Sequence, residues 1–93
     1  MSFAIAADHP SLPGHFPGQP IVPGVVLLAE IFARIEDAFP GTCVAVLLHA
    51  KFLAPVRPGE AIALSFEPPV AGRVGFAGLV AGTRVLHGTV QLA

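Results

Sequence analysis

The side chains that could carry out acid–base chemistry lie in one proline-rich segment and the stretch that follows it, GHFPGQPIVPGVVLLAE, residues 14–30. His15 is one of them, because histidine ionises near neutral pH and can accept a weakly acidic proton. Gly24 precedes an apolar stretch, and free N–H groups at the start of a helix stabilise negative charge developing on a substrate. Glu30 could donate a proton if an apolar site kept its carboxyl group protonated. Together, a base, an oxyanion donor and an acid could catalyse proton transfer next to a carbonyl group.

A loop and a helix must position these groups. Half of the ten prolines lie in residues 10–23, and such a segment forms an ordered, extended loop or tight turns rather than a flexible linker. Within residues 25–39, the spacing of Glu30, Arg34 and Asp37 places all three on one polar stripe of a helix. Most of the remaining circumference is hydrophobic, so we expect a helix of about four turns that is buried on most sides. A Pro-Gly pair then ends it.

The rest of the sequence predicts an antiparallel sheet. Segments with the composition of strands cover residues 42–54, 60–67, 73–80 and 83–92. Ala81-Gly82, between the last two, is a hairpin turn, and Phe3–Ala6 could add an edge strand. One helix followed by four strands favours an α+β architecture, in a single domain over residues 1–93, with the sheet wrapped around the helix.

The composition excludes several classes of protein. Of the 93 residues, 54% are hydrophobic and 12% charged, which excludes a disordered chain. A net charge of −1 argues against a nucleic-acid-binding protein held by a basic patch. The longest charge-free stretch, residues 9–29, contains too many prolines and glycines for a membrane helix. So apolar a chain has more hydrophobic surface than one small core can bury, which predicts a subunit interface or a lipophilic cavity.

The remaining local signals favour a cytoplasmic protein without a cofactor. The single cysteine, Cys43, cannot form an internal disulfide, which suits a reducing compartment, and we expect it to be a small buried hydrophobe. The first ten residues lack the pattern of a secretory signal. No metal-ligand spacing and no glycine-rich phosphate loop occurs, so we expect neither a metal nor a nucleotide cofactor.

Two segments resemble a known family. The loop matches the pattern G-H-F-P-G-x-P-x-x-P-G, and a later segment, residues 51–60, is similar to K-F-x-x-P-V-x-P-G-D. The chain thereby resembles the hot-dog-fold 3-hydroxyacyl-ACP dehydratases of fatty-acid biosynthesis, from about residue 8 to its end. The resemblance implies a hot-dog fold, in which an antiparallel sheet wraps one long central helix. It also implies a homodimer or higher hot-dog oligomer, because each site is shared between subunits.

The resemblance also implies an activity and a set of site residues. The reaction would remove water from a 3-hydroxyacyl thioester, carried by acyl carrier protein, to give the trans-2-enoyl thioester. His15 would be the base, and the amide of Gly24 would hold the thioester carbonyl, which approaches closely because glycine has no side chain. Phe16, Gly18 and Val25 would contribute to substrate binding. Packing among Leu27, Leu28, Phe32 and Phe52 would set the depth of the acyl cavity.

The chain departs from the family pattern at the acid. The resemblance places a carboxyl group from the helix of the other subunit five residues beyond Gly24, and that position is Ala29. Glu30 follows one residue later, a rotation of about 100° on a helix. Either Glu30 pairs with Arg34 on the polar stripe, or a local bulge turns it into the site as the catalytic acid. The alternatives to a dehydratase are therefore a non-catalytic acyl-binding accessory subunit, possibly heterodimeric, and an acyl thioesterase.

Other polar side chains have simpler interpretations. We expect the three remaining histidines, His9, His49 and His87, to be structural, with His49 on a partly exposed strand face. Four cations could contact an acidic carrier protein: Lys51, Arg57, Arg73 and Arg84.

Overall fold

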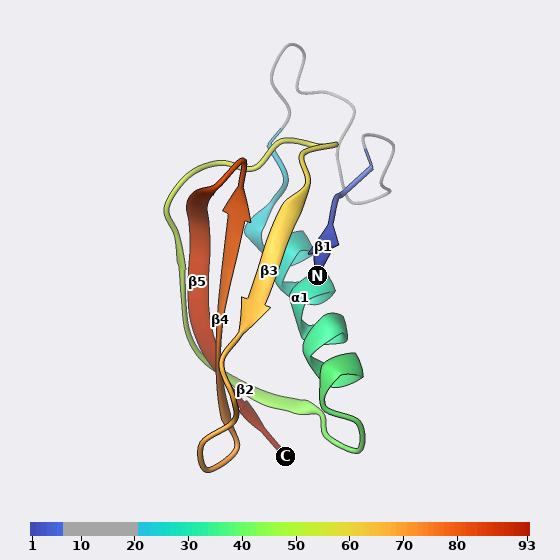
Figure 1. Cartoon of the computed structure of the whole chain (residues 1–93), viewed down its shortest axis with the longest axis vertical. Coiled ribbons are helices and arrows are strands. Elements are labelled where there is room, and N and C mark those ends of the chain that lie inside the picture. The colour runs from blue at the N-terminus through green and yellow to red at the C-terminus, as the bar shows by residue number, and fades with distance from the viewer. Residues whose placement is uncertain (7–20) are drawn as a thin grey trace.

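The described residues form one helix and a five-stranded antiparallel sheet (Figure 1). The computed structural model describes residues 1–6 and 21–93. Its elements are β1 (Ser2–Phe3), α1 (Gly24–Ala38), β2 (Val44–Phe52), β3 (Ile62–Phe66), β4 (Arg73–Val80) and β5 (Thr83–Leu92). The strands follow the order β1-β3-β4-β5-β2, so β1 and β2 form the two edges. The predicted α+β architecture is confirmed, and an N-terminal edge strand is present, at Ser2–Phe3 rather than at Phe3–Ala6.

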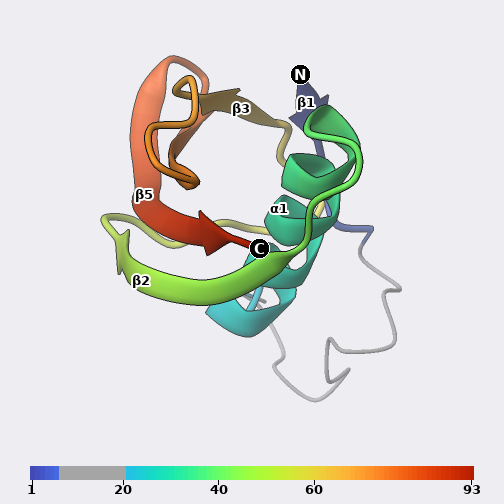
Figure 2. The same cartoon turned by 90° about the horizontal axis from the view of Figure 1, so that it is seen from below.

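The sheet curves around one side of the helix (Figure 2). From α1, Val26, Leu27, Ile31 and Ile35 are buried against the sheet. On the sheet side, the core contains Ile62, Leu64, Val74, Phe76, Leu86 and Val90. Each large aliphatic side chain buried in this way contributes about 1.5–3 kcal/mol to the free energy of folding.

The helix is less buried than its composition predicts. Val25 is 74% exposed, and Ala29 and Ala33, one and two turns further on, are exposed as well. The expectation of burial on most sides was wrong for the single chain, because the sheet covers only one face of α1. The opposite face is apolar but uncovered.

The end of the helix is tied to the start of β2. Phe39 follows α1, and the hydroxyl of Thr42 donates a hydrogen bond to the Phe39 carbonyl over 2.6 Å. The Glu36 carboxylate accepts a hydrogen bond of 2.8 Å from the backbone N–H of Val44. This contact assigns one flank of α1, the flank of Glu36, to β2.

Much of the exposed apolar surface gathers in two places. One is β2 and the residue after it, where the exposed large side chains are Val46, Leu47, Leu48, Phe52 and Leu53. The other is the start of α1, where Ile21 and Val25 are exposed. The hydrophobic surplus of the sequence therefore lies at an edge strand and at one end of the helix.

Cys43 is exposed, so the expectation that it is buried was wrong. It lies between α1 and β2, where its backbone exchanges hydrogen bonds with Ala93 at the last residue of the chain. Among the described residues, no helix is long and apolar enough to cross a bilayer.

Two tight turns have the backbone that hairpins require. Ala81 and Gly82 have φ values of 50° and 82° between the paired residues Val80 and Thr83, which confirms the predicted hairpin. Positive φ at both central residues is the signature of a type I′ turn, whose twist matches that of the strands. Ala71 and its neighbouring glycine repeat this geometry before β4, with φ values of 52° and 77°.

Ala81→Gly should stabilise the fold. A left-handed conformation costs a residue other than glycine about 1–2 kcal/mol, and the greater freedom of glycine in the unfolded chain offsets about 0.5–1 kcal/mol of the gain. We expect the free energy of unfolding in urea to rise by about 0.5–1 kcal/mol. Ala77→Gly, within β4, is the matched control and should lower it. A decrease in both variants would contradict the turn geometry.

Candidate active site

A cavity of about 420 Å³ opens beside the start of α1. Its lining is nonpolar and comes from the segment before the helix, from the first turn and from the chain that leaves β2: Ile21, Val22, Pro23, Gly24, Leu27, Phe52, Leu53, Ala54, Pro55 and Val56. A backbone hydrogen bond of 2.8 Å from Val22 N–H to the Val56 carbonyl joins the two segments. A nonpolar cavity beside a helix start can bind an acyl chain at its thioester end.

The first residue of the helix, Gly24, lines this cavity. The amides of Val26 and Leu27 donate to the Pro23 carbonyl, at 3.0 and 3.3 Å. Within the described part of the chain, no acceptor bonds the amides of Gly24 and Val25, and Pro23 provides no side-chain cap. Such free amides at a helix N-terminus stabilise an oxyanion.

Gly24 lies against the ring of Phe52. A Cβ atom placed on Gly24 would lie 2.9 Å from Phe52 Cζ and 3.0 Å from Cε2, closer than such atoms approach in proteins. Residue 24 must therefore be a glycine as long as the ring keeps this position. The sequence identified Gly24 and the K-F pair separately, but nothing in it indicated that the two touch.

Glu30 forms an ion pair on the flank of α1 that lies towards β1. Its carboxylate forms an ion pair of 2.5 Å with the Arg34 guanidinium, which lies 4.6 Å from the centre of the Phe3 ring in β1. The helix is continuous over Gly24–Ala38, so it contains no bulge that would turn Glu30 elsewhere. The pairing that the i, i+4 spacing predicted is present, and it holds Glu30 towards β1 and away from β2.

Ala29 lies on the same flank of α1 as Glu36. It is seven residues before Glu36, and positions seven apart on a helix have nearly the same direction. The Glu36 carboxylate bonds the first residue of β2, so the Ala29 flank is the one beside the exposed edge strand. The position where the resemblance places an acid thus carries an exposed methyl group.

The other predicted site residues have different outcomes. His15, Phe16, Gly18 and His9 lie outside the described residues. The Val25 side chain points outward and does not line the cavity. Of the side chains expected to set the cavity depth, Leu27 and Phe52 line it, while Leu28 and Phe32 pack against the core. No group of three or more metal-binding side chains occurs in the described ranges.

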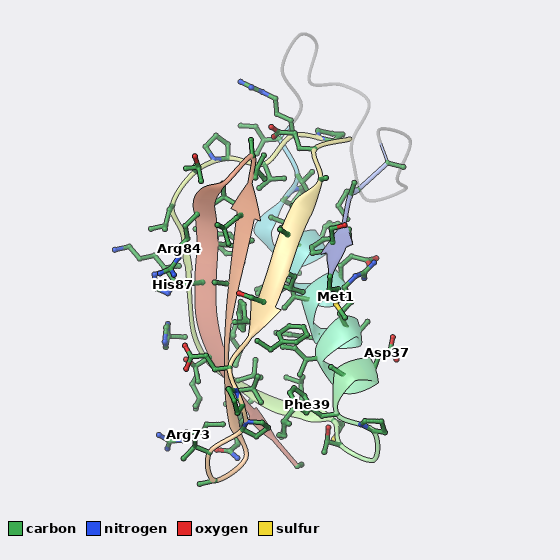
Figure 3. All side chains as sticks on the ribbon, in the orientation of Figure 1. Met1, Asp37, Phe39, Arg73, Arg84 and His87 are labelled. Carbon is green, nitrogen blue, oxygen red and sulfur yellow. The ribbon has the colours of Figure 1, made fainter. Side chains whose placement is uncertain are left out.

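A second hollow, of about 370 Å³, lies on the outer face of the sheet. His49 shares a hydrogen bond of 3.1 Å with Thr89, and its ring meets that of His87 edge-on, with centroids 5.9 Å apart. The lining also includes Arg73 and Arg84. Figure 3 shows both arginines and His87 projecting on the side of the sheet away from α1.

Although the chain is nearly neutral, its cations and its acids gather on different elements. Lys51 pairs with His87 in the ladder and shares the outer face with the two arginines of the hollow, and the acid there is Glu67. The helix carries Glu30, Glu36 and Asp37, with Arg34 as its cation. The low net charge of the chain argued against a basic patch, but the outer face of the sheet is locally basic.

Comparisons with known proteins show similarity to dehydratases. The family model ApeI-like, described as ApeI dehydratase, matches residues 1–90. A 3-hydroxyacyl-[acyl-carrier-protein] dehydratase FabZ from Klebsiella pneumoniae is 32% identical, over 96% of this chain and 68% of its own length. A FabZ from Protochlamydia amoebophila is 44% identical over 58% of this chain, and the match spans only 40% of that relative.

Solved structures share the fold. The dehydratase heterocomplex ApeI:P from Xenorhabdus doucetiae matches with a TM-score of 0.83 and 21% identity, over 99% of this chain and 83% of that chain. An uncharacterised protein from Erwinia carotovora matches with a TM-score of 0.84 and 21% identity, over 99% and 79%. The protein therefore has a hot-dog fold, as predicted. It belongs to the ApeI-like dehydratase family, whose model covers nearly its whole length.

The pairing of Glu30 with Arg34 can be measured by a double-mutant cycle. Glu30→Gln and Arg34→Gln should each lower the free energy of unfolding slightly, since the pair is partly exposed to water. Their coupling energy should be about 0.3–0.5 kcal/mol and should decrease in high salt. Additive effects of the two substitutions would mean that Glu30 is free of Arg34 in solution.

Proposed function

We propose that the chain is a dehydratase subunit that acts on 3-hydroxyacyl thioesters carried by acyl carrier protein. The observation that carries this proposal is the helix start at Gly24, whose amide has no acceptor among the described residues, beside a nonpolar cavity in a member of a dehydratase family. The FabZ relatives bear a name that specifies this substrate class. The chain would contribute the base and the oxyanion donors of the site.

The chemistry follows from these groups. His15 takes a proton from the carbon next to the thioester carbonyl, and the negative charge moves to the carbonyl oxygen, where the amide of Gly24 stabilises it. The electron pair then forms the carbon–carbon double bond as the bond to the 3-hydroxyl oxygen breaks. An acid protonates the departing hydroxide, so the products are a trans-2-enoyl thioester and water.

We propose that this acid comes from another chain. Among the described residues, the lining of the cavity includes no carboxyl group, Ala29 carries only a methyl group, and Glu30 is paired with Arg34 on the flank that faces β1. A subunit with Asp or Glu at the position equivalent to Ala29 would complete the site that contains His15. A relative of this fold is described as a dehydratase heterocomplex, so a mixed dimer is a natural assembly for this chain.

The edge strand β2 is the surface on which we place the subunit contact. It is unpaired on one side and carries exposed large apolar side chains, which a second hot-dog subunit would cover. The flank of Ala29 lies beside it. A homodimer through the same edge remains the alternative, and it would leave both of its sites without a helix carboxyl group at position 29.

We place the carrier protein on the basic outer face of the sheet. Lys51, Arg73 and Arg84 lie there and would attract an acidic protein. Lys51 also immediately precedes Phe52, whose ring lines the cavity, so a carrier bound at this face is near the site. An exposed single thiol at Cys43 suits the cytoplasm as the proposed compartment.

An assay of enoyl formation tests the missing acid. The wild-type chain alone should be slow on any 3-hydroxyacyl carrier, and Ala29→Glu should raise the rate by about 10²-fold or more, the typical contribution of a general acid. Ala33→Glu, an equally exposed alanine about 6 Å further along the helix, should give no increase. Adding His15→Ala to Ala29→Glu should remove the gain.

Other outcomes of the same assay would contradict this assignment. A fast wild-type chain that loses its rate in Glu30→Gln would make Glu30 the acid. If neither the wild type nor Ala29→Glu forms enoyl product, the chain is a non-catalytic acyl-binding subunit. Release of free acid in place of enoyl product would favour a thioesterase.

Binding of an acidic carrier protein should depend on the outer face. Arg73→Glu and Arg84→Glu should each weaken it several-fold at low salt, since they place like charges against the carrier. Glu67→Gln should strengthen it, because Glu67 is the opposing charge in the hollow. Titration calorimetry at two salt concentrations measures these effects. Equal affinities in all three variants would place the carrier elsewhere.

A further inference from the structure

We propose that Phe52 limits the bulk that the site accepts next to the thioester carbonyl, and that its ring is the reason residue 24 lacks a side chain. This inference rests on the proposed function for its substrate class, but the contact between Phe52 and Gly24 exists independently of it. The resulting selectivity would favour unbranched 3-hydroxyacyl thioesters over those with a substituent on the carbon between the carbonyl and the hydroxyl-bearing carbon.

The contact is short and involves the tip of the ring. A Cβ atom on Gly24 would meet Cζ, Cε2 and Cε1 of Phe52 at 2.9, 3.0 and 3.5 Å. All three are ring atoms at the far end of the side chain, and Phe52 is 45% exposed. The ring is therefore close to the helix and only partly enclosed by the core.

The backbone beneath the ring is fixed. Phe52 is the last residue of β2 and pairs with Leu86 of β5, which is buried. The next amide, of Leu53, donates a hydrogen bond of 2.7 Å to the Val85 carbonyl. Phe52 therefore forms a wall of the cavity beside Gly24. Its strand fixes the backbone, and its ring lines the space.

This wall stands next to the amides that would hold the substrate oxygen. Because the Gly24 amide is to bind the carbonyl, the atoms nearest the ring are the carbonyl carbon and its immediate neighbours. The ring would thus restrict substituents near the thioester more than it restricts chain length. One additional methyl group against such a wall typically changes selectivity by about 10–200-fold.

The selectivity is tested with two substrates that differ by one methyl group. Both are 3-hydroxyacyl thioesters on the same carrier, one unbranched and one methylated on the carbon next to the carbonyl, assayed with the oligomer that turns them over. Phe52→Ala should raise the ratio of kcat/KM for the methylated over the unbranched substrate by at least tenfold. Leu48→Ala, on the same strand and equally exposed but outside the cavity, should leave the ratio unchanged. A ratio that stays constant in Phe52→Ala would overturn the proposal.

A stability cycle tests the contact without any turnover. Gly24→Ala should lower the Tm of the parent chain, because the new methyl group pushes the ring away. In the Phe52→Ala background the same substitution should leave the Tm unchanged or raise it, since alanine is the better helix former. An equal decrease in both backgrounds would overturn the role of the ring. If no substrate is turned over, the proposed function fails, and the cycle still decides whether the ring excludes a side chain at residue 24.

Discussion

The rotation of α1 about its own axis is the constraint on which the account of the site depends. Leu27, Ile31 and Ile35 are almost completely buried against the sheet, and together they fix which way every other position of the helix points. Rotating the helix far enough to turn Glu30 towards β2 would take these side chains out of the core. Removing a large buried aliphatic side chain from its packing costs about 2–5 kcal/mol, far more than a partly exposed ion pair contributes.

This fixed rotation gives the two flanks of the helix different partners. Arg34 lies over Phe3 of β1 on one flank, and Glu36 bonds the start of β2 on the other. The edge strand β2 carries exposed apolar side chains, and the methyl group of Ala29 is exposed as well. Under the proposed assembly, a subunit that binds the edge strand would meet Ala29 before Glu30.

Local signals in the sequence predicted most of the fold, and contacts between distant segments account for what they missed. The bounds of β4 and β5 follow from the alternating pattern and the Ala81-Gly82 turn, both local properties. Whether Cys43 is buried or exposed depends on which distant segments pack against it. The local sequence pattern does not predict those contacts. The contact of Phe52 with Gly24 joins residues 28 positions apart, so only the fold brings them together. At the site, the ion pair of Glu30 was predictable from helix spacing, whereas the role of Glu30 in catalysis stays a prediction.

A structure of the assembled oligomer tests the central claim, that the flank carrying Ala29, and not Glu30, faces the neighbouring active site. In an assembly of two copies of this chain, the account predicts that the Cβ atom of Ala29 lies opposite His15 of the partner subunit and that Glu30 keeps its ion pair with Arg34. The contrary result would be a Glu30 carboxylate released from Arg34 and placed across the interface, within a substrate's width of the partner's His15.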